Sequence, residues 1–288
     1  MFINRVKTFL LLIGLSAILI LLGNLCCGAL GMQIALAFSL FMNILAYFYS
    51  DKIVLKLYKA KPMDAEQYGW IYAVTEELTG KMNIPMPKLW IIHAPMANAF
   101  ATGRSPANAS VAVTTGIIDT LDQDELRGVI AHELAHVKNR DILIATIAAT
   151  IATAISYIAS MLRYSLFWGS NRRRNGSPLL ILLMAIVMPI AAIIIQLAIS
   201  RSREYLADET GAKYSQDPLA LASALEKLHS TSRYTAPKEQ SAGKESTASL
   251  FIVHPFSGKN VSNLFSTHPP INKRIERLKK MYEKKYHL

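Results

Sequence analysis

Long stretches without a charged residue most constrain what this chain can fold into. No Asp, Glu, Lys or Arg occurs between Lys7 and Asp51, and further uncharged apolar runs cover Ile142–Leu162 and Pro178–Ser200. Apolar residues make up 52% of the sequence and the mean hydropathy is +0.26. A helix needs about 20 apolar residues to cross the hydrocarbon core of a bilayer. The sequence therefore predicts a mainly α membrane protein with four apolar helices in two hairpins.

The first uncharged stretch is too long for one helix. Gly23, Asn24 and Gly28 lie near its middle, where they favour a turn. We expect two spans, roughly Thr8–Leu25 and Ala29–Tyr49. A cleaved signal peptide is the alternative, but its apolar region would be shorter and a second span would not follow at once. A retained N-terminal hairpin over residues 1–50 is favoured.

Basic residues on both sides of this hairpin indicate its orientation. They precede the first span and follow the second: Arg5, Lys7, Lys52, Lys56, Lys59 and Lys61. By the positive-inside rule, residues 51–141 then face the cytosol. The second hairpin, residues 142–200, breaks this rule, because its connecting segment carries Arg163 and Arg172–Arg174. This hairpin either crosses the membrane twice, with its orientation set by the earlier spans, or is a re-entrant hairpin. In both cases residues 201–288 return to the cytosolic face.

The net charge and the cysteine content limit the partners that this chain is expected to bind. The net charge is +11 and the isoelectric point is near 9.6. No basic groove with interleaved aromatic residues is evident, so nucleic acid is not an expected partner. Basic residues that flank membrane helices and attract anionic lipid account for the charge. Cys26 and Cys27 are adjacent and form neither a disulfide framework nor a metal ligand set.

The segments outside the apolar runs predict an α+β domain with a small sheet. Asp64–Lys81 has the pattern of an amphipathic helix, with Asp64 and Gln67 at capping-box spacing. Three short β-like pieces follow, separated by proline and glycine: Lys88–His93, Asn98–Thr102 and Ser110–Thr114. Arg274–Lys285 predicts a basic closing helix. The domain is thus expected in two parts, residues 51–141 and 201–288, on either side of the second hairpin.

The sequence His132-Glu133-Leu134-Ala135-His136 predicts a metal site. On a helix the two histidines lie one turn apart on the same face and can bind one ion, while Glu133 is placed to take a proton from water. Asp122 with Glu125 forms a capping box that starts this helix. A catalytic zinc has three protein ligands and one open position.

The third ligand is expected after the fourth span. Glu204 and Asp208 are again one helical turn apart, so both can face the histidine helix. We assign Glu204 as the third ligand and Asp208 as the partner of the other nitrogen of a histidine. Ordinary surface ion pairs with Arg201 or Arg203 are the alternative.

Taken together, the motifs resemble HtpX-type membrane metallopeptidases, bacterial relatives of the CAAX prenyl endopeptidases. They are His132–His136, Ser200–Asp208, Asn98–Ala101 and Ser266–Pro270. The resemblance covers nearly the whole chain, in order. It implies a gluzincin-like zinc peptidase domain that faces the cytosol from the inner membrane of a bacterium. It also implies His132, His136 and Glu204 as zinc ligands, Glu133 as general base, and a role in membrane-protein quality control under stress.

Two further segments are candidates for the substrate site. Asn98, Ala99 and Phe100 have the pattern of an edge strand, which could pair with an extended substrate; an ordinary strand and turn is the alternative. His268 precedes Pro269 and Pro270. It could donate a hydrogen bond to the oxyanion during catalysis, or it could be a capping or surface histidine.

The function that follows is a membrane zinc endopeptidase with one zinc ion, acting on unfolded or damaged membrane proteins. The rival hypothesis is a non-catalytic membrane scaffold or transporter with a structural metal. Transporters usually carry ionisable residues inside their spans, and these four have none. A structural zinc would need a fourth protein ligand, for which no cysteine is in position. The oligomeric state is left open.

Overall fold

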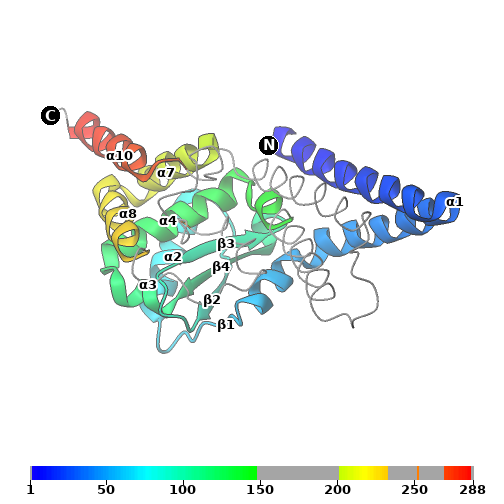
Figure 1. Cartoon of the computed structure of the whole chain (residues 1–288). Coiled ribbons are helices and arrows are strands. Elements are labelled where there is room, and N and C mark those ends of the chain that lie inside the picture. Colours follow the sequence, from blue (N-terminus) through cyan, green and yellow to red (C-terminus); the bar gives the residue numbers. More distant parts are fainter. Residues whose placement is uncertain (1, 148–200, 233–251, 253–268, 287–288) are drawn as a thin grey trace, which may run out of the picture.

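The computed structural model describes residues 2–147, 201–232, 252 and 269–286 (Figure 1). The first helix, α1 (Phe2–Leu57), reverses direction at Gly28, whose φ is +59°. The Asn43 amide donates a hydrogen bond to Ser16 Oγ over 2.9 Å. In a straight helix these two residues would lie about 40 Å apart. Hence the two halves of α1 run alongside each other, as the blue ribbon of Figure 1 shows.

Apolar side chains cover the surface of α1. In the described part of the chain, one segment is long and apolar enough to cross a membrane, Gly28–Leu45, and 11% of it is buried inside the protein. Phe38, Leu40 and Phe41 are each more than half exposed. Such a surface is suited to lipid. The second expected hairpin falls almost wholly on residues 148–200, outside the described residues.

A four-stranded mixed sheet follows α1, with the strand order β1-β2-β4-β3. β2 and β4 are parallel, and the two outer strands are antiparallel to their neighbours. The bounds are Lys61–Pro62 for β1, Lys88–Ile92 for β2, Ala99–Gly103 for β3 and Ala109–Thr114 for β4. The three β-like pieces expected from the sequence are therefore strands of one sheet, and β3 is at its edge.

Both faces of this sheet are buried, since alternate side chains enter different cores. Leu89, Val111 and Val113 face the main core, which side chains from the surrounding helices complete. Phe100 and Ala112 face the other way, where Val54 and Leu55 near the end of α1 cover them. This second core attaches α1 directly to the sheet.

The helix expected at Asp64–Lys81 begins later than the sequence indicated. α2 is Gly69–Met82, and Tyr68 occupies its N-cap position without a side-chain hydrogen bond. The Asp64 carboxylate instead accepts a hydrogen bond from the Glu66 amide in a turn. The predicted start is wrong because an aspartate with a free amide two residues on caps a turn as readily as a helix.

The remaining helices surround the one that carries the metal motif. A 3₁₀ turn (η1) is Pro106–Asn108, α3 is Thr115–Thr120 and α4 is Gln123–Asn139. α7 (Arg201–Ser215), α8 (Pro218–Ser232) and α10 (Ile271–Tyr286) complete the described part. In Figure 1, α4 lies between the sheet and these C-terminal helices. The first and second halves of the chain therefore meet at α4.

Candidate metal centre

Helix α4 presents two histidines to one point. Its first turn is fixed by the expected capping box, in which Asp122 accepts from the Glu125 amide and Glu125 accepts from the Asp122 amide. The His132 and His136 rings lie one turn apart, with their Nε2 atoms 3.2 Å from each other. His132 is 1% exposed, so this point lies inside the protein.

Glu204 reaches the same point from α7. Its Oε2 is 3.8 Å from His132 Nε2 and its Oε1 is 3.6 Å from His136 Nε2. The two helices approach closely because Gly211 has no side chain. An ideal Cβ at that position would lie 2.9 Å from the backbone nitrogen of His132. The glycine thus sets the spacing of α7 and α4 and with it the reach of Glu204.

This arrangement suits a metal ion. The candidate ligand atoms of His132, His136 and Glu204 all lie within 4.8 Å of one another. Two imidazole nitrogens on one tetrahedral zinc, at bonds of about 2.0–2.1 Å, would be about 3.3 Å apart. The observed 3.2 Å between the Nε2 atoms matches that spacing. Within the described residues no other His, Cys, Asp or Glu joins the group.

Each histidine is oriented by a carboxylate behind it. His132 Nδ1 is 3.0 Å from Asp208 Oδ1, and His136 Nδ1 is 3.1 Å from Asp141 Oδ2. These contacts hold both rings with Nε2 toward the cluster, and for His136 the hydrogen bond to Asp141 also fixes the tautomer. His132 Nε2 lies in addition 3.4 Å from Arg274 Nη2. Burial disfavours a charged imidazole, but the carboxylates of Asp141, Glu204 and Glu133 together outweigh it and raise the pKa of His136 to about 10. The opposite holds for His132, whose pKa burial lowers, with Arg274 and His136 adding to the effect.

A buried arginine from the last helix completes the centre. Arg274 is 1% exposed and donates to both Asp208 carboxylate oxygens, from Nε over 2.8 Å and from Nη2 over 2.7 Å. Its Nη1 donates to the Ile252 carbonyl over 3.1 Å and lies 3.5 Å from Glu204 Oε2. Burial would raise the pKa of Asp208, but Arg274 and His132 lower it. Helix α10 is therefore a structural part of the metal centre.

Glu133 lies beside the cluster, in contact with the edge strand. Its Oε2 accepts a hydrogen bond from the Ala101 amide over 2.8 Å, and the residue is 4% exposed. Burial raises the pKa of Glu133 to about 8, with Glu204 adding to the effect and His136 opposing it. A carboxylate whose pKa is raised in this way is chemically suited to exchange protons near neutral pH.

The other residues that the sequence predicted for the site do not all lie at the metal cluster. Asn98 is buried beside the start of β3, where its side-chain oxygen accepts from the Ile252 amide over 3.4 Å. Ala99 lies on the face of the main core. Phe100 points to the opposite face and packs on Tyr58, with ring centroids 5.6 Å apart. His268 lies outside the described residues, and its role stays a prediction.

Sequence reasoning missed Asp141 and Arg274. Asp141 follows the end of α4, where an acidic residue is readily interpreted as the N-cap of the next helix. Arg274 begins the segment that the sequence predicted as a basic closing helix. A signal was present, because Ile271, Ile275 and Leu278 form an apolar stripe and position 274 lies on it. A charged residue on a buried stripe indicates a buried ion pair.

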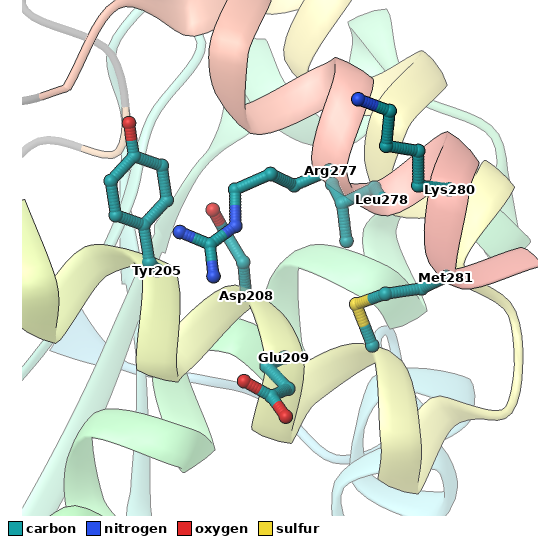
Figure 2. A pocket seen from close by; sticks show the side chains of 7 residues that line it. All are labelled: Tyr205, Asp208, Glu209, Arg277, Leu278, Lys280 and Met281. Carbon is teal, nitrogen blue, oxygen red and sulfur yellow. The ribbon is translucent and has the colours of Figure 1, made fainter.

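A cavity of about 280 Å³ lies on the outer side of this region, between α7 and α10. Figure 2 shows its lining, in which the Arg277 guanidinium stacks over the Tyr205 ring at 4.2 Å. Asp208 is the one residue that the cavity shares with the metal centre, and none of the three candidate ligands lines it.

Comparisons with known proteins identify the family of this chain. The family model of peptidase family M48 matches residues 65–282. A protease HtpX homolog of Syntrophobacter fumaroxidans is 49% identical over 96% of this chain and 99% of its own length. A protease HtpX homolog of Pyrococcus furiosus is 50% identical over 96% of this chain and 95% of its own length.

The fold also resembles a solved structure, that of S. mikatae Ste24p. The TM-score is 0.52 at 19% identity, over 96% of this chain and 66% of that longer chain. At this identity the likeness concerns the fold alone. The family match spans most of the sequence, including all three candidate metal ligands, and the relatives align over nearly their full length. The chain belongs to peptidase family M48, as a metalloprotease of the HtpX type.

Proposed function

We propose that this protein is a zinc endopeptidase that hydrolyses unfolded or damaged membrane proteins at the cytosolic face of the bacterial inner membrane, in quality control under stress. The observation that carries the proposal is the convergence of His132, His136 and Glu204 on one point with Glu133 beside it. These residues come from segments on either side of the second apolar hairpin. The ligand set is the one expected of an open, catalytic zinc.

The chain supplies the ligands, their orientation and a proton carrier. His132, His136 and Glu204 would hold the ion, which polarises the scissile carbonyl and makes water a better nucleophile when bound. Asp208 and Asp141 keep the imidazole rings turned so that Nε2 faces the cluster. Glu133 takes a proton from the attacking water and passes it to the nitrogen of the leaving amine. No acyl-enzyme is formed, because water attacks the peptide carbon directly.

The edge strand β3 is the proposed docking site for an extended substrate. Its outer edge faces α4, as the contact between the Ala101 amide and Glu133 demonstrates. A substrate strand added there would gain main-chain hydrogen bonds with little dependence on its sequence. Such pairing suits an enzyme whose substrates are unfolded but have no sequence motif in common. The exposed apolar surface of α1 and its core contact with β3 would hold this strand close to the bilayer.

Glu133→Gln tests the proposal. The full chain is purified in detergent with zinc bound, and cleavage of unfolded β-casein is compared with that by the wild type. We expect a loss of about 10²–10⁴-fold in rate with unchanged zinc content, since only proton transfer is removed. The control is Glu209→Gln, an exposed carboxylate on α7. Cleavage by Glu133→Gln at the wild-type rate would refute the role of this residue.

Chelation separates the enzyme from the rival scaffold. For a catalytic ion, a chelator abolishes cleavage and added zinc restores it. A scaffold with a structural ion would show no cleavage at any zinc content and would only unfold when the ion is removed.

A further inference from the structure

Strand β3 runs alongside the last turns of α1. At one end Phe100 packs on Tyr58, with ring centroids 5.6 Å apart. At the other end the Arg104 guanidinium, directly after β3, lies over the Phe48 ring at 5.0 Å from its centroid. Four residues of strand extend about 13 Å and ten residues of helix about 15 Å, so the two contacts fit elements that lie side by side in opposite directions. The Gly103 end of β3 therefore points toward the apolar part of α1.

Phe48 marks the level at which this apolar part ends. The segment long enough to cross a membrane is Gly28–Leu45, and Phe48 follows its end by three residues, or about 4.5 Å of helix. Tyr47, Phe48 and Tyr49 are each at least 40% exposed. Aromatic side chains that flank an apolar span in this way collect at the headgroup level of a bilayer. Arg104, which lies against Phe48, is therefore at the height of the lipid phosphates.

A second cation lies at the same level. Lys52 follows Phe48 by one helical turn on the same face and is exposed, with its Nζ 5.1 Å from the centroid of the Tyr49 ring. Asp51 is the one acidic residue of α1 and is half-buried. Among the described residues no carboxylate forms an ion pair with Arg104 or Lys52. The two cations are thus available to an anion from outside the described part of the chain.

We propose that Arg104 and Lys52 bind the phosphate of an anionic phospholipid, with the Phe48 ring against the lipid chain. The guanidinium presents a planar pair of donors that matches a phosphate, and the ammonium adds a second positive charge. The anion is a lipid rather than free phosphate, because the exposed apolar surface of α1 begins directly beside the two cations. This site goes beyond peptide hydrolysis. Since Arg104 directly follows β3, a bound headgroup holds that strand at a fixed distance from the bilayer.

Lipid retention by the full chain tests this proposal. The protein is purified in a neutral detergent, and its affinities for phosphatidylglycerol and for zwitterionic phosphatidylcholine are measured by native mass spectrometry. We expect the wild type to bind phosphatidylglycerol more tightly. In Arg104→Gln this affinity should fall by about 10- to 100-fold, the value of a hydrogen bond to a charged group. Arg104→Lys keeps the charge but not the planar pair of donors, so it should recover part of the loss.

Arg277→Gln is the matched control. Arg277 is exposed and also lies over an aromatic ring, that of Tyr205, but it belongs to α10, at the opposite side of the molecule from α1 (Figure 1). It should keep the wild-type affinity. An equal fall in both glutamine variants would indicate attraction by net charge alone and would overturn the proposal, as would equal affinities of the wild type for the two lipids. Displacement of phosphatidylglycerol by inorganic phosphate at equal concentration would also overturn it, because the site would then take free phosphate. No substrate is present, so these outcomes do not depend on whether the protein cleaves peptides.

Discussion

Replacing Arg274 by alanine would leave a buried carboxylate without its guanidinium. The side chain makes two charge-assisted hydrogen bonds to Asp208 and a third to the Ile252 carbonyl, at 1% exposure. Breaking a buried pair by removing one partner costs about 3–5 kcal/mol. At about 2–4 °C per kcal/mol, we expect the Tm to fall by about 6–20 °C. Since Asp208 orients His132, zinc affinity should also fall, by about 10- to 100-fold.

The assay is thermal unfolding of the detergent-solubilised protein, with zinc affinity measured by chelator competition. Arg127→Ala is the control, because Arg127 makes the same two-pronged contact with Glu77 at the surface. An exposed pair contributes about 0–1 kcal/mol, so its Tm should change by less than about 4 °C and its zinc affinity not at all. A fall in Tm no larger for Arg274→Ala than for Arg127→Ala would refute the reasoning.

Two further predictions concern helix spacing and pH. Gly211→Ala should lower both the Tm and the zinc affinity, since the new Cβ would lie about 2.9 Å from the backbone of His132 and push α7 away. Gly80→Ala is the control, because a Cβ at position 80 contacts nothing. It should leave the zinc affinity unchanged and raise the free energy of unfolding by about 0.5–1 kcal/mol. Hydrogen bonding to Arg127 lowers the pKa of Glu77 to about 2. That pair therefore stabilises the fold fully above about pH 4.5 and progressively less toward pH 2, so Glu77→Gln should lower the Tm slightly at pH 7 and by less at pH 3. Equal Tm differences at both pH values would contradict this assignment.

Local features of the sequence predicted the local structure well. The capping box at Asp122 and the apolar pattern behind it correctly indicated the helix that carries His132 and His136. The β-like pieces became strands, because alternation and flanking prolines depend on neighbouring residues only. The start of α2 was misplaced because an Asp64 turn and an Asp64 cap have the same local signature.

Spacing along a helix also placed Glu204 and Asp208 on one face. Spacing alone did not indicate which helix that face would pack against. The structure shows that α7 packs on α4 through Gly211, which brings Glu204 within 4 Å of both histidines. Before that contact is known, the two carboxylates are equally compatible with surface ion pairs to Arg201 or Arg203.

The sequence by itself indicated the chemistry of the candidate site: two imidazoles and a carboxylate at helical spacing, together with apolar runs long enough to span a membrane. Only the tertiary structure decided what holds those groups in place. Asp141 lies after the end of the metal helix, and Arg274 is 66 residues from the Asp208 carboxylate that it bonds. The physical reason is that helix and strand periodicity act over a few residues, whereas the pairing of buried charges and the satisfaction of edge amides depend on how the elements pack.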